Sequence, residues 1–331
     1  MDNKRYYNLS LYRIIATLLV LQFHIFFICY ADDITNTIYL SKFLQGLTAL
    51  SGFIFSQKLI SSIKDFYLKR VWRIFVPALL ALFLMVIWNL LFMMITHQND
   101  FIATFVGHRA YNNGLLIEPG NYYYIPYILF CYLITPLLHK KNWLSILVTI
   151  IVIGIETTFI IKVEPTYIAT SYIIGFYVGK FFFNRYTDKY EVKDLLHLLI
   201  WAILFIGTFL ISYYLLHGVI HIKGKFHYIL RGFTLMVFGV STLFIFLLGF
   251  KFINRINKIV VLDYTDKLSY IIFLLNQTFM CGAMNVTTYV SPMYLKTILV
   301  YVFTISFSIA VYFLSTRVNK LIKKDTVVVK R

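Results

Sequence analysis

The chain has 331 residues, of which 60% are hydrophobic, 19% aromatic and only 14% charged, and its mean hydropathy is +0.76. A soluble globular domain carries about 25% charged residues, so this composition excludes an ordinary soluble protein and predicts an integral membrane protein. The 31 Lys and Arg residues outnumber the 14 Asp and Glu residues, an excess that here indicates basic cytoplasmic loops and attraction to anionic lipid rather than nucleic-acid binding.

Several segments of the chain are apolar and long enough to cross a bilayer as helices, since a span needs about 20 mostly apolar residues. The first of them lacks a small-residue cleavage site, so we expect a retained helix rather than a signal peptide. The segments predict an all-α membrane protein, a bundle of about ten transmembrane helices. In chain order the expected spans are 9–30, 41–57, 74–96, 122–138, 143–161, 166–183, 195–216, 229–250, 268–290 and 293–316.

The basic residues between these spans predict how the chain is oriented. Lys and Arg are frequent in every second connection and sparse in the others, and the richer side of a membrane protein is cytoplasmic. This bias predicts two cytoplasmic termini, with Lys42 in a sparse outer connection and the longest outer loop over 97–121. We expect one integral membrane domain over 1–331, without a soluble domain, in the bacterial cytoplasmic membrane.

Arg13 and His24 are polar residues within the first apolar segment and are the strongest candidates for a functional site. A charged side chain within hydrocarbon costs at least about 2.5–3.5 kcal/mol to insert, so it usually marks a site. Their spacing places them on one helix face, about 16 Å apart along the axis. We expect Arg13 to bind an anion and His24 to act as a general base. The alternatives are that Arg13 reaches the inner headgroups and that His24 is a hydrogen-bonded core histidine.

Arg70 and Arg73 precede the third expected span, at its cytoplasmic end. They share a helix face if the helix has already begun there, because they are three residues apart. Guanidinium groups bind phosphate with two parallel hydrogen bonds, so this pair is a candidate phosphate site. The alternative is the general positive charge of a cytoplasmic loop.

Other polar positions within the apolar segments have competing interpretations. Ser51 and Gly52 are small residues in an apolar segment, a pattern typical of close helix packing. The alternative is that the backbone at these residues lines a substrate channel. Glu156, in the fifth expected span, is either a partner for Arg231 or a proton-relay residue of a transporter. Asn276, in the ninth, is expected to form an interhelical hydrogen bond.

Five short stretches, taken in their order, form a pattern that covers nearly the whole chain. They are Arg13 to His24, Ser51-Gly52-Phe53, Arg70-x-x-Arg73 followed by Ile74 and Pro77, Tyr124-Ile125-Pro126 and Leu268-Ser269-Tyr270. This pattern resembles the acyltransferase 3 family of bacterial membrane O-acyltransferases. Asn276 departs from it, because many members of that family have a His after the Ser-Tyr motif.

The resemblance implies a membrane O-acyltransferase that takes an acyl group, commonly acetyl, from cytoplasmic acyl-CoA to a hydroxyl of a surface polysaccharide or lipid-linked glycan. It implies Arg13 and His24 as catalytic residues and Arg70 and Arg73 as the site of the donor. Further expected partners are membrane lipids and glycosyltransferases of polysaccharide synthesis. We expect acetyl-CoA as a substrate, no permanently bound cofactor, no metal and no nucleic acid. The competing functions are a transporter or flippase of a glycan intermediate, without covalent chemistry, and an inactive assembly partner.

Overall fold

The computed structural model describes residues 6–328 except 31–33, 98–123, 141, 160–166, 223, 257–258, 277, 281–285 and 288–289. Helices make up the regular secondary structure of these residues, and no strand occurs among them. The predicted all-α class is therefore confirmed. The outer loop expected over 97–121 lies, apart from its first residue, outside the described part of the chain.

The chain falls into two compact units, which are described separately. Three helices, α1 (Tyr7–His24), α4 (Ile63–Thr96) and α11 (Val260–Leu275), begin in unit 1 and end in unit 2. Unit 1 comprises Met1–Val20, Asp33–Lys64 and Pro126–Asp266, and unit 2 comprises Leu21–Asp32, Asp65–Ile125 and Lys267–Arg331.

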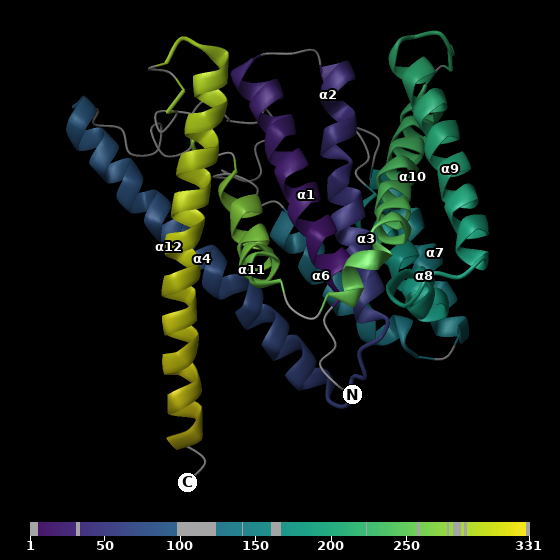
Figure 1. The fold of residues 1–331 in the computed structure, drawn as a ribbon, viewed down its shortest axis with the longest axis horizontal. Helices are drawn as coiled ribbons and strands as arrows, with labels where there is room; N and C mark the ends of the chain where they lie inside the picture. Colours follow the sequence, from purple (N-terminus) through teal and green to yellow (C-terminus); the bar gives the residue numbers. More distant parts are fainter. Residues whose placement is uncertain are drawn as a thin grey trace. The chain divides into compact units, whose positions relative to one another are not determined.

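Unit 1 is built around α3 (Phe43–Phe55), which packs most extensively against α8 (Ile168–Thr187) and also against α10 (Lys225–Gly249). α9 (Lys193–Leu216) lies along α10 (Figure 1). Aromatic side chains fill the centre of this unit, as in the stacked rings of Trp201 and Phe244, whose centroids are 4.5 Å apart. Its other elements are α2 (Ile34–Ser41), α6 (Tyr124–Leu138), α7 (Asn142–Phe159) and the short η2 (Lys251–Arg255).

Unit 2 contains the long helices α4 (Ile63–Thr96) and α12 (Met293–Val328), together with most of α11. Its core joins Ala81 and Met85 of α4 to Ile271 and Leu275 of α11 and to Val311 of α12. A five-residue π-helix, η1 (Ile25–Cys29), continues α1 and contacts α12.

Six helical stretches of the described chain are long and apolar enough to cross a membrane, judged by length and composition. Two more apolar helices, Tyr124–Leu138 and Asn142–Thr158, are shorter. The lipid-facing character is clearest on α9, where large side chains such as Leu195 and Ile203 are more than half exposed. The predicted count of ten spans and the predicted cytoplasmic termini stay predictions. The six stretches are Tyr7–Cys29, Thr37–Phe55, Ile63–Ile95, Lys193–Leu216, Lys225–Gly249 and Met293–Lys320.

The structure differs from the expected elements in two places that matter for the site. Lys42, expected in an outer connection, is 7% exposed at the break between α2 and α3, inside the stretch Thr37–Phe55. The helix expected over 268–290 instead begins at Val260 and ends at Leu275. Asn276 lies in the turn that follows, where the backbone N–H of Thr278 donates to the Leu275 carbonyl at 3.0 Å. The short polar side chains of Asn276 and Thr278 are of types that favour turns over helix interiors.

Candidate active site

His24 is the last residue of α1 and is 9% exposed. The edge of the Phe23 ring approaches the imidazole, with the ring centroids 5.1 Å apart. Directly after His24 the chain changes from α-helix to the π-helix η1, for which His24 is the N-cap. π-helical turns are rare and frequently occur at functional sites. The predicted base therefore lies in an aromatic setting, at a change of helix type that the apolar sequence of 25–29 does not reveal.

Arg13, earlier on the same helix, forms an ion pair with Asp266 of α11. Ser10, one turn before Arg13, donates its hydroxyl hydrogen to the other carboxylate oxygen of Asp266, Oδ2, at 3.0 Å. The side chain of Arg13 is 32% exposed and that of Asp266 is 11% exposed. All three residues belong to unit 1.

Asp266 is the residue of this cluster that sequence reasoning missed. It lies two residues before the expected span 268–290 and therefore reads as a loop residue, whereas the structure places it in the second turn of α11. An arginine within hydrocarbon needs an acidic partner, so the sequence does indicate that some Asp or Glu pairs with Arg13. The sequence separation of 253 residues hides which acid meets that requirement.

Arg70 and Arg73 both lie on α4, which begins at Ile63, so the condition for a shared helix face is met. Their environments differ. Arg70 is half-buried, and its guanidinium lies over the ring of Phe66, 5.6 Å from the ring centroid. Arg73 is exposed. The pair thus presents one restrained and one accessible guanidinium.

The four predicted site residues belong to two helices. Arg13 and His24 are held at a fixed spacing by α1, and Arg70 and Arg73 are held at one by α4. His24, Arg70 and Arg73 lie in unit 2, while Arg13 lies in unit 1.

Glu156 has a structural task in the described part of the chain. Its two carboxylate oxygens accept hydrogen bonds from the backbone N–H groups of Ala169 and Thr170, both at 2.8 Å, and from the Thr170 hydroxyl at 2.6 Å. Tyr167, the N-cap of α8, has φ +43° and makes no side-chain capping bond. Glu156 of α7 therefore caps α8 from outside that helix, and it is not paired with Arg231.

Ser51 and Gly52 serve helix packing. A Cβ on Gly52 would lie 2.0 Å from the carbonyl oxygen of Tyr172, so the backbones of α3 and α8 touch here. The Ser51 hydroxyl donates to the carbonyl of Leu47 in its own helix at 3.2 Å. Packing, rather than a channel lining, accounts for this small polar step.

The family model of the acyltransferase domain, Acyl_transf_3, matches residues 6–317. The chain belongs to the acyltransferase 3 family. Neither the curated proteins nor the solved structures include a match. Membership over nearly the whole chain confirms the predicted resemblance and, with the apolar helices, supports a multi-pass membrane protein of the acyltransferase class.

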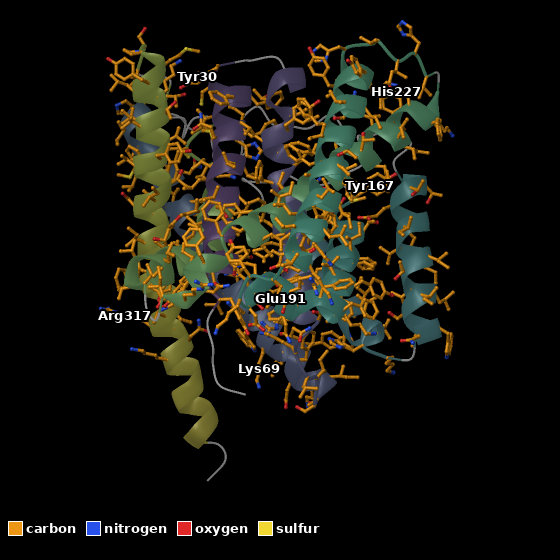
Figure 2. All side chains as sticks on the ribbon, turned by 45° about the vertical axis from the view of Figure 1, so that its right-hand side comes forward. Tyr30, Lys69, Tyr167, Glu191, His227 and Arg317 are labelled. Atoms are coloured by element: carbon orange, nitrogen blue, oxygen red, sulfur yellow. The ribbon has the colours of Figure 1, made fainter. Side chains whose placement is uncertain are left out.

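A second polar cluster of this acyltransferase lies in unit 1, where α8, α9 and η2 meet. Lys251, 2% exposed, donates to Asp194 Oδ2 at 2.6 Å and to the carbonyl of Lys189 at 2.9 Å. Arg185 lies 3.7 Å from the other oxygen of Asp194. Figure 2 shows Glu191, in the loop beside this cluster, and His227 at opposite ends of the unit.

A pocket of about 430 Å³ opens beside that cluster. Basic side chains line it together with acidic ones, so its charges largely offset each other. Arg185 belongs both to the pocket and to the cluster, which leaves Lys180 and Lys189 as its other cations. The polar lining residues are Gln57, Lys180, Asn184, Arg185, Asp188, Lys189 and Glu191.

Proposed function

We propose that this family member is a membrane O-acyltransferase that moves an acyl group, acetyl in the first instance, from cytoplasmic acyl-CoA to a hydroxyl of a surface polysaccharide or of its lipid-linked precursor. The observation that carries the proposal is the arrangement on α1. A buried imidazole, His24, ends the helix that also carries a partly accessible arginine, Arg13. Both side chains are of types that hydrocarbon disfavours unless they have a task.

The chemistry follows from an imidazole placed beside a hydroxyl. His24 removes the proton of the acceptor hydroxyl while its oxygen attacks the thioester carbonyl carbon. A C–O bond forms, the C–S bond breaks, and CoA leaves as a thiolate. The proton held by His24 passes to that sulfur, so the products are an ester and a free thiol, and the imidazole is neutral again.

The length of α1 supports chemistry far from the donor's point of entry. His24 lies seventeen residues beyond Tyr7, which is about 26 Å along a helix. We propose a cytoplasmic N-terminus, from which a helix of this length reaches the outer half of a bilayer about 30 Å thick. CoA then stays on the cytoplasmic side while only its acyl-bearing arm reaches the acceptor.

We assign the 3′-phosphate of the donor, at its adenosine end, to Arg70 and Arg73. Guanidinium groups at i and i+3 of one helix match the several oxygens of a phosphate better than scattered lysines do. The ring of Phe66 beneath Arg70 restrains one of the two groups before the donor arrives.

The role of His24 is tested by acyl transfer from labelled acetyl-CoA in membranes that contain the protein. His24→Ala should lower the rate by at least about 100-fold, the usual size of a general-base contribution. His217→Ala, which removes an exposed histidine near the end of α9, is the matched control and should leave the rate unchanged. Full transfer by His24→Ala would reject this residue as the base.

The phosphate site is tested by the dependence of the rate on donor concentration. Arg70→Gln/Arg73→Gln should raise the KM for acetyl-CoA with little change in kcat, because phosphates are bound equally in the ground and transition states. Lys69→Gln removes an exposed cation from the same helix and controls for general positive charge. If the KM for acetyl-CoA rises in Lys180→Gln and not in the arginine variant, the donor binds in the pocket beside Arg185 and not at Arg70 and Arg73.

Deletion of the gene separates the enzyme from the competing transporter. A surface glycan that persists without its acyl groups indicates acyl transfer, and mass spectrometry of that glycan identifies the acyl group and the modified sugar. A glycan that is missing altogether indicates translocation. The capping role of Glu156 removes one residue that a proton-coupled transporter would need.

A further inference from the structure

The guanidinium of Arg13 has hydrogen-bond donors to spare. An arginine side chain offers five N–H donors in a fixed planar fork. Among the described residues, Arg13 donates to Asp266 and to no other group. Four donors are left on a side chain that is one-third exposed.

Asp266, in contrast, is held from two sides. One of its oxygens accepts from Arg13 and the other from the Ser10 hydroxyl at 3.0 Å. Ser10 and Arg13 are three residues apart on α1, so both face α11. Because each oxygen has its own partner, the carboxylate is fixed, and it fixes the plane of the guanidinium in turn.

The spacing along α1 matches the length of one part of the proposed donor. Arg13 lies eleven residues, about 16 Å, before His24 on the same helix face. The pantetheine arm of CoA has about thirteen bonds between the diphosphate and the sulfur. At the roughly 1.2 Å per bond of an extended chain, it reaches about 16 Å. A diphosphate at Arg13 would therefore deliver its thioester to His24.

We propose that Asp266 is a positioning residue, which orients Arg13 so that the free edge of its guanidinium binds the diphosphate of acyl-CoA. This inference rests on the proposed function and adds to it the acid that prepares the donor site. The single carboxylate also balances the arginine charge while no donor is bound, which lowers the cost of keeping that charge within the membrane.

Donor analogues test the proposal, because they separate positioning from mere stability. Acetyl-CoA and acetyl-dephospho-CoA carry the diphosphate, whereas acetyl-pantetheine does not. Arg13→Gln should lower kcat/KM for the two diphosphate donors by about 10- to 100-fold, the usual worth of a charged hydrogen bond. Asp266→Asn should lower it for the same donors by about tenfold, and both variants should lose much less with acetyl-pantetheine, which carries no diphosphate.

Two further variants complete the design. Arg13→Gln/Asp266→Asn should behave as Arg13→Gln does alone, because Asp266 acts through Arg13. Lys267→Gln removes the exposed charge next to Asp266 in α11 and should leave the ratio between donors unchanged. If Asp266→Asn does not accumulate in membranes, Ser10→Ala replaces it. Ser10→Ala removes the hydroxyl bond to Asp266 Oδ2 without removing the charge of Asp266, and it should give a severalfold loss mainly with the diphosphate donors.

The outcomes distinguish the inference from the function on which it rests. An Asp266→Asn or Ser10→Ala protein that transfers from every donor as the wild type does, or that loses all donors equally, would overturn the positioning role and leave the acyltransferase proposal intact. A wild-type protein that transfers from none of the three donors would overturn the acyltransferase proposal itself.

Discussion

Backbone atoms of α3 and α8 approach each other closely in unit 1, and this contact predicts a large effect of one methyl group. A Cβ on Gly175 of α8 would lie 1.9 Å from the carbonyl oxygen of Ala49. A Cβ on Gly52 of α3 would lie 2.0 Å from the carbonyl oxygen of Tyr172. Neither oxygen belongs to a side chain that can rotate away, so Gly175→Ala must push the two helices apart.

Two opposing contributions set the size of the effect. Overpacking costs about 1–3 kcal/mol, and a clash with backbone puts Gly175→Ala at about 3 kcal/mol. Alanine is more favourable than glycine in a helix interior by about 1 kcal/mol. The net loss of unfolding free energy is about 2 kcal/mol, which changes the ratio of folded to unfolded protein by roughly 30-fold.

The assay is reversible unfolding by SDS in mixed micelles, followed by circular dichroism. Gly154→Ala and Gly207→Ala are matched controls, because a Cβ at either position meets no atom within 4 Å. They should keep the gain in helix propensity and be neutral or up to about 1 kcal/mol more stable. If Gly175→Ala unfolds at the same SDS fraction as these controls, the packing argument is refuted.

Three further predictions concern polar groups of unit 1. Glu156→Gln replaces one of the two acceptors at the start of α8 with an N–H₂ group and should lower the unfolding free energy by about 1–2 kcal/mol in the same SDS assay. Lys251→Met leaves Asp194 buried without its closest cation and should cost about 3 kcal/mol, while Lys251→Met/Asp194→Asn should be more stable than Lys251→Met alone. Burial, together with nearby Lys180, lowers the pKa of His139, although its bond to the Phe55 carbonyl opposes this. The unfolded chain then binds that proton more tightly, so thermal stability should fall as the pH drops through about 6.5, and His139→Gln should flatten this fall.

Hydropathy predicted long uninterrupted apolar helices well, whether most of their side chains are exposed, as in α9, or buried, as in α10. The spans expected over 195–216 and 229–250 differ from α9 and α10 by a few residues at the start and by one at most at the end. α11 was misjudged at both ends, because Asp263 and Asp266 precede its apolar part and Asn276 follows it. Asp266 makes tertiary contacts with Ser10 and Arg13, and the periodicity of the sequence carries no record of such contacts.

The candidate site was predictable one helix at a time. The cost of a charge in hydrocarbon singles out Arg13 from sequence alone, and the spacing to His24 follows from helix geometry. Two features were out of reach. The partner of Arg13 comes from the far end of the chain, and the π-helix after His24 is formed by the apolar residues of 25–29, which fit an α-helix equally well.

The cost of a charge in hydrocarbon singled out both Arg13 and Glu156 in the sequence. The hydrogen bonds of the two side chains show that their roles differ. Glu156 has partners on both oxygens, and Lys251 has a carboxylate, a carbonyl and the ring of Tyr190 around its ammonium group. Charged groups that have protein partners on every side, as these two have, serve the structure of the protein. Toward the described residues, Arg13 uses one N–H donor of its five, and about a third of its side chain is accessible. Guanidinium N–H groups without a protein partner are available to a ligand, and this difference between Arg13 and the other two residues is why we propose that Arg13 binds the donor's diphosphate.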